Sequence, residues 1–308
     1  MPAAMRRNNL LHSKVTRFTR MLPAAEAGDV RAVHRARVAS RRLRELVPLL
    51  DIDADVRHKL VRRLRKATIR LGKVRELDVL RLAIEELRVS ARYPASVTRR
   101  LLQSVHESRG RAGRVLAHQS RAADFGRVAR HLERLADRVD LEAPKVEVST
   151  EALNARIAKR ARTLQRAIEA AGAVYIPERL HDVRIAVKKL RYAVELSVEL
   201  DARASHAALD LLKHVQQQLG RMHDLQILIE HARRVQTDQT SADTAPRRQF
   251  NVLIISLDTT CHRLHARYLR ERERLIGICE RLSARSGGRS RMSKAAMITA
   301  AMTLRGTV

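Results

Sequence analysis

The sequence feature that most constrains the fold is a short motif that occurs twice. Residues 33–44 read VHRARVASRRLR, and residues 180–191 read LHDVRIAVKKLR. In both copies a histidine is followed by basic residues three, seven, eight and ten positions later. On an α-helix, positions 0, 3, 7 and 10 lie within an arc of about 80°. The motif therefore predicts two helices, each with a narrow stripe of cations.

We call these stripes the first and second basic ribs, and they are our candidate functional site. The first comprises His34, Arg37, Arg41, Arg42 and Arg44, and the second comprises His181, Arg184, Lys188, Lys189 and Arg191. Apolar residues occupy the opposite side of the first helix, namely Ala36, Ala39, Leu43, Leu46, Val47 and Leu50. This division predicts an apolar face for the core and a cationic face turned away from it. Arg42 and Lys189 lie about 80° from the histidine of their copy and could instead point into solvent.

The duplication extends beyond the ribs, because Leu71-Gly72 recurs as Leu219-Gly220 at nearly the same offset as the two histidines. Helices are expected at about 8–22, 29–50, 53–89, 96–139, 151–171, 177–200, 205–235 and 249–282. This pattern predicts an all-α chain made of two tandem antiparallel four-helix bundles. The expected division is 1–145 for the first half, 146–285 for the second and 286–308 for a flexible tail. The stretch from Asp140 to Thr150 is the expected linker.

Composition indicates the class of partner. The chain has 62 Lys and Arg against 33 acids, a net charge of +29, which favours a polyanionic ligand. A solvated arginine-rich surface is the alternative. Two cysteines in 308 residues are too few for a disulfide framework, so both are expected to be free thiols. No apolar stretch approaches the length of a membrane span, which leads us to expect a soluble cytoplasmic protein.

At the duplicated motif the chain resembles the CHAD family of α-helical domains. The resemblance lies in VHRARVASRRLR with LGKVRELDVL, and in LHDVRIAVKKLRY with LGRMHDLQIL, and it spans about residues 8–282. It implies two helical bundles related by a pseudo-two-fold axis, with a basic groove or pore between them. It also implies binding of inorganic polyphosphate and an association with polyphosphate granules. Rows of Arg and Lys suit such a polymer, because Arg gives bidentate donors to neighbouring oxygens and Lys a mobile charge.

The roles of several residues, inside and outside the ribs, allow two interpretations. Arg65 and Lys213 each precede the Leu-Gly leucine by six residues, and they either extend the lining or lie on the surface. The two histidines either donate hydrogen bonds to phosphate or pack near a helix start. Glu76 and Asp224 are expected to orient arginines, since one carboxylate in each half is a poor cation site.

Other functions have weaker support in the sequence. Backbone binding to DNA or RNA is the main alternative, although the scarcity of aromatic residues argues against stacking on bases. Cys261, His262, His265 and Cys279 match no usual zinc spacing. There is no P-loop, nucleophile elbow or carboxylate cluster near the ribs, so we expect a binding protein with no catalytic activity, metal or cofactor.

Overall fold

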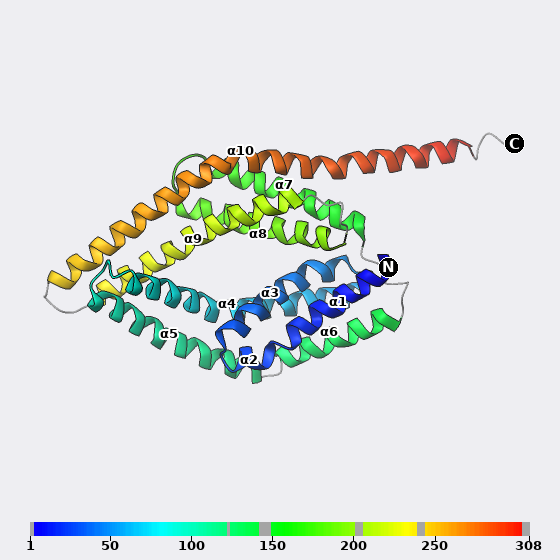
Figure 1. The fold of residues 1–308 in the computed structure, drawn as a ribbon. Coiled ribbons are helices and arrows are strands. Elements are labelled where there is room, and N and C mark those ends of the chain that lie inside the picture. The colour runs from blue at the N-terminus through cyan, green and yellow to red at the C-terminus, as the bar shows by residue number, and fades with distance from the viewer. Residues whose placement is uncertain (1–2, 122–123, 142–148, 201–205, 239–243, 304–308) are drawn as a thin grey trace. The chain divides into compact units, whose positions relative to one another are not determined.

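Helices make up the regular structure in the computed structural model, which describes residues 3–121, 124–141, 149–200, 206–238 and 244–303 (Figure 1). The elements are α1 (Ala3–Thr19), α2 (Leu22–Glu26), α3 (Val30–Leu46), η1 (Val47–Leu49), α4 (Ala54–Val89), α5 (Ala95–Arg121), α6 (Asp124–Leu141), α7 (Thr150–Ala171), α8 (Pro177–Leu200), α9 (His206–Thr237) and α10 (Thr244–Thr303). Among the described residues there is no β-strand. The all-α prediction is therefore confirmed.

Most expected helix boundaries agree with the structure to within a few residues, but three regions do not. The stretch 96–139, expected as one helix, forms the separate helices α5 and α6. The region from Pro23 to Gly28 forms the short helix α2 and then a turn, because Pro fits the first turn of a helix. At the other end, α10 continues through Ser286-Gly287-Gly288 to Thr303. The expected helix end there is wrong, since two glycines cost a helix only about 1 kcal/mol each and helix-forming residues follow them. The mobility of the tail stays a prediction.

The chain forms two compact units, which we describe separately. The first unit comprises residues 1–148 and 220–265, and the second comprises residues 149–219 and 266–308. Both α9 and α10 therefore contribute residues to each unit. The division expected from the sequence repeat stays a prediction, and most of the expected linker lies outside the described residues.

Five helices form most of the packing in the first unit. Helix α3 packs against α1 and α4, and α6 also packs against α1 and α4, while α5 covers another side of α4. Fully buried side chains at their centre include Phe18, Leu43, Leu64 and Phe125. One core therefore has two separate edges, one at the seam between α1 and α3 and the other at the seam between α4 and α6.

Local sequence sets where α3 begins and which face it buries. Asp29 is its N-cap and accepts a hydrogen bond from the Ala32 backbone N–H at 2.6 Å. All six residues expected on its apolar face are buried. Ser40 and Thr68 are also buried, and their hydroxyl oxygens lie 2.9 Å apart, which joins α3 to α4. The cationic residues of α3 are thereby held on the opposite side from the core.

The second unit is built around α7 and α8, which pack against each other. Leu164, Ile168, Val183 and Leu190 are fully buried in it. Its helix α8 starts at Pro177, as expected for a residue that fits the first helical position. In the part of the chain that the structure describes, every helix is too short or too polar to cross a lipid bilayer.

Candidate functional site

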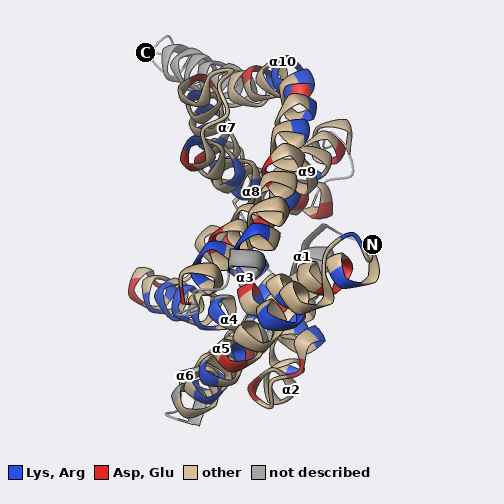
Figure 2. Cartoon of the chain, turned by 90° about the vertical axis from the view of Figure 1, so that its left-hand side faces the viewer, with Lys and Arg blue, Asp and Glu red and all other residues tan. Residues whose placement is uncertain are grey.

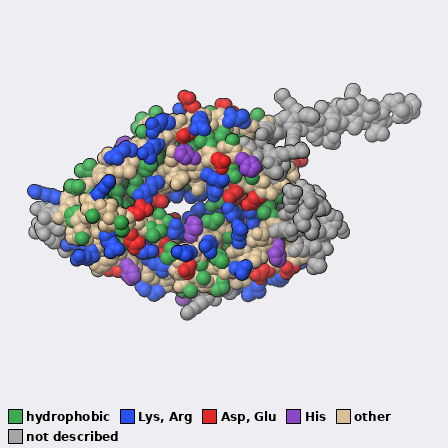
Figure 3. Space-filling view, in the orientation of Figure 1, with side chains coloured by type: hydrophobic (Ala, Val, Ile, Leu, Met, Phe, Trp, Pro, Cys, Tyr) green, Lys and Arg blue, Asp and Glu red, His purple; other side chains and the backbone are tan. Residues whose placement is uncertain are grey.

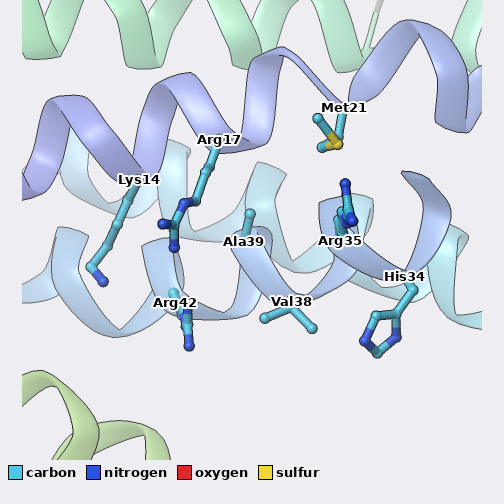
Figure 4. Close-up of a pocket in the computed structure, with 8 residues that line it drawn as sticks. All are labelled: Lys14, Arg17, Met21, His34, Arg35, Val38, Ala39 and Arg42. Carbon is cyan, nitrogen blue, oxygen red and sulfur yellow. The ribbon is translucent and has the colours of Figure 1, made fainter. Parts of the chain in front are cut away.

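A cationic pocket lies along the seam between α1 and α3 in the first unit. Its volume is about 370 Å³, and its lining consists of Lys14, Arg17, Met21, His34, Arg35, Val38, Ala39 and Arg42. Lys14 and Arg17 point from α1 toward Arg42 on α3, and Arg35 points toward Met21 (Figure 4). No acid is among these lining residues. The pocket therefore combines four permanent cations and one histidine over an apolar floor.

His34 stands in a strongly positive environment. Desolvation lowers its pKa most, and the charges of Arg75, Arg37, Arg41 and Arg35 lower it further. Its imidazole is nevertheless exposed to solvent. A neutral, accessible imidazole beside several arginines can accept a proton when an anion enters and offsets their charge.

Arg37 lies against α4. An added Cβ at Gly72 would meet the Arg37 Nε at 3.3 Å, so the missing side chain of Gly72 leaves room for this guanidinium. Arg37 Nη2 also lies 3.9 Å from Glu76 Oε1, and the Arg37 side chain is only 20% exposed. Glu76 therefore lies close enough to pair with an arginine of the first rib, and its role in orienting that arginine stays a prediction. The Leu-Gly segment of the sequence thus supports the first basic rib.

The other predicted residues of the first rib lie on the same helix but are not all in the pocket. Arg42 lines it, although its phase allowed a position in solvent. Arg41 and Arg44 are half-buried on α3 outside the pocket lining. Arg65 is exposed on α4, also outside that lining.

The second rib lies on α8 and is described within the second unit alone. His181, Arg184 and Lys188 are half-buried, and Lys189 is exposed. Arg191 is engaged inside the unit, because its Nε donates to Gln216 Oε1 at 2.7 Å and its guanidinium lies 4.3 Å from the centre of the Tyr192 ring. Lys213 is exposed on α9 and pairs with Asp210 at 3.0 Å.

Sequence reasoning missed four cations of the site. Lys14, Arg17 and Arg35 line the pocket, and Arg75 lowers the pKa of His34. Arg75 lies within the quoted Leu-Gly segment, and its distance from that segment's glycine places it on the face of α4 toward α3. Lys14 and Arg17 carry no such signal, since nothing in the local pattern of α1 says which helix covers its basic side.

Charge by itself does not locate this site. Lys and Arg side chains are spread over the visible face of the described residues (Figure 3). Cys261 and Cys279 are buried free thiols, as expected. Among the described residues, no three His, Cys, Asp or Glu side chains lie close enough together to hold a metal ion.

Comparison with known families identifies the fold. The model of the CHAD domain family matches residues 10–233, which is more than half of the chain. The chain belongs to the CHAD domain family. Both motif copies, and all residues predicted to bind polyphosphate, fall within the matched range.

Solved structures agree with the CHAD fold. The chain is similar to the crystal structure of the CHAD domain from the plant Ricinus communis, with a TM-score of 0.58 and 20% identity over 85% of this chain and 91% of that one. It is also similar to PptA from Streptomyces chartreusis, with a TM-score of 0.54 and 19% identity over 94% and 100% of the two chains. A search of curated proteins gave no match. At these identities the likeness concerns the fold alone.

Proposed function

We propose that this CHAD domain binds inorganic polyphosphate without catalysing a reaction on it. The observation that carries the proposal is the acid-free pocket between α1 and α3, whose lining includes Arg17, Arg35, Arg42 and His34. The first basic rib continues along α3 from this pocket to Arg44. A role for the second rib in the same ligand, a groove formed by both ribs and a location at polyphosphate granules stay predictions.

The dimensions of the pocket and rib suit a chain of phosphates. A volume of about 370 Å³ corresponds to roughly 12 water-sized groups at about 30 Å³ each, enough for several phosphoryl units. From His34 to Arg44 the helix rises about 15 Å, which extends the row of donors past the pocket. Guanidinium groups donate to two oxygens at once, so neighbouring phosphates can share one arginine.

The pocket offers binding groups and lacks the groups that phosphoryl transfer needs. Its ionisable lining consists of Lys14, Arg17, His34, Arg35 and Arg42, with no carboxylate to hold a divalent cation or act as a base. This supports a binding role. Incubation of the purified protein with polyphosphate and Mg²⁺ should release no orthophosphate above the blank, and steady release would overturn the non-catalytic assignment.

The binding test compares two variants of equal charge. One is the pocket variant Arg17→Ala with Arg35→Ala, and the other is Arg99→Ala with Arg100→Ala, which removes two exposed arginines from α5. Calorimetric titration with polyphosphate of defined length should show about tenfold weaker binding for the pocket variant, because two ion contacts near 0.7 kcal/mol each are lost. The α5 variant should change the affinity by less than about twofold.

Equal losses in the two variants would show that only the net charge matters and would overturn the site. The same titration with duplex DNA, at equal phosphate concentration, tests the alternative function. Polyphosphate should bind more tightly than DNA. DNA binding of equal or greater affinity would favour the nucleic-acid interpretation.

A further inference from the structure

A second cationic pocket lies on the seam between α4 and α6. Its volume is about 170 Å³, and it is lined by Arg62, Arg63, Lys66, Ala67, Arg70, Phe125 and Val128. Lys and Arg residues recur along both helices (Figure 2). The described residues that line this pocket include four cations and no acid. None of these residues belongs to either basic rib, so neither the duplicated motif nor the proposed function explains them.

This pocket lies on a different side of α4 from the candidate polyphosphate site. Thr68 contacts α3 through Ser40, whereas Arg63 contacts α6, with its Nη1 3.1 Å from His131 Nδ1. Positions five residues apart on a helix point in directions about 140° apart. The two pockets are therefore separated by the body of α4, and one compact ligand does not reach both.

The chemistry of the lining favours phosphate. Arg62 and Lys66, and Lys66 and Arg70, are pairs of like charge four residues apart, which slightly destabilise the helix, and a bound anion would offset their repulsion. The hydrogen bond to His131 uses one of the five N–H donors of Arg63 and holds its guanidinium beside the pocket. Phe125 and Val128 are almost fully buried and form an apolar wall. A charged ligand there would meet four cations on one side and an apolar wall on the other.

We propose that the α4/α6 pocket is a second anion site, which takes a compact ligand carrying one or two phosphate groups. Its volume corresponds to roughly six water-sized groups at about 30 Å³ each, close to the seven oxygen atoms of diphosphate. Long polymers fit the first rib better, because the α1/α3 pocket is about twice as large and this pocket spans just over two turns of α4. The same phosphate chemistry is present in a free small anion and at the end of a longer phosphate chain.

The probe is inorganic diphosphate, and two valines report where it binds. Val128 lines the α4/α6 pocket and Val38 lines the α1/α3 pocket. In methyl NMR spectra of the full chain, titration with diphosphate should shift the Val128 methyl signals at lower concentrations than those of Val38. Shifts at Val38 alone, or at neither valine, would overturn the proposal. The Val38 response to polyphosphate tests the proposed function separately, so the two ideas can fail independently.

A charge-matched pair of variants checks that the shift reports binding. Arg62→Ala with Lys66→Ala removes two exposed cations from this pocket, and Arg99→Ala with Arg100→Ala again serves as the control. We expect the first variant to bind diphosphate about tenfold more weakly with an unchanged circular-dichroism spectrum, and the control to bind like the wild type. Equal weakening in both variants would show non-specific attraction and overturn the site.

A parallel titration with long-chain polyphosphate distinguishes the source of the phosphate. The two titrations are compared at equal concentrations of chain ends. Saturation of the Val128 shift by diphosphate at the lower concentration identifies a free small anion as the ligand. Saturation by the long chain at the lower concentration identifies a chain end, and either result supports an anion site at this seam.

Discussion

Arg109 is the side chain whose removal should destabilise the first unit most among its charged residues. Its Nε donates to Asp78 Oδ1 at 3.2 Å, and its Nη2 donates to the Gly28 carbonyl oxygen just before α3. Asp78 is completely buried, whereas Arg109 is 26% exposed. Replacement of Arg109 by Met would leave a buried carboxylate without its cation, a change that costs about 3–5 kcal/mol in folded proteins. Because Arg109 is partly exposed, we expect about 3 kcal/mol.

Urea unfolding followed by circular dichroism measures this loss, and two further variants test its cause. Arg111→Met removes an exposed guanidinium from the same helix and should cost less than about 0.5 kcal/mol. The double variant Asp78→Leu with Arg109→Met removes both charges and should be more stable than Arg109→Met alone. An Arg109→Met loss below about 1 kcal/mol, or a double variant less stable than the single one, would refute the reasoning.

Three further predictions concern the site and its supports. His34 is held neutral because desolvation and nearby arginines lower its pKa, so a bound polyanion should raise that pKa and affinity should increase as pH falls below about 6.5. Calorimetry in two buffers at pH 6.5 should detect proton uptake that His34→Gln abolishes, and uptake that persists in this variant would assign the proton elsewhere. Gly72→Ala should raise the free energy of unfolding by about 0.5–1 kcal/mol, because alanine has the higher helix propensity and the Arg37 guanidinium can shift by a few tenths of an ångström. A loss of stability above about 1 kcal/mol in urea unfolding would contradict this. Arg191→Met should destabilise the second unit by about 1–2 kcal/mol, because its contacts with Gln216 and Tyr192 are lost. The same variant should change polyphosphate affinity by less than about twofold. A large affinity loss at unchanged stability would show that Arg191 is a ligand.

Local sequence determined the helices and the buried face of α3. Helix periodicity depends only on residues within a few positions of one another, so the spacing of Ala36, Leu43 and Leu46 was enough to predict their burial. The cap of α3 is equally local, because Asp29 bonds a backbone N–H three residues away. The duplicated motif also indicated the family, which the match to residues 10–233 confirmed.

Only the tertiary structure decided which cations share a pocket. Arg42 belongs to the first basic rib and Arg35 lies outside it, yet both line one pocket because α1 packs on that side and adds Lys14 and Arg17. Arg37 belongs to the same rib but lies over Gly72 of α4. Helical phase gives the direction of each side chain from its own axis, but not which neighbouring helix lies in that direction. The neighbouring helix is determined by packing between segments far apart in the sequence, because these segments bury their apolar faces against one another.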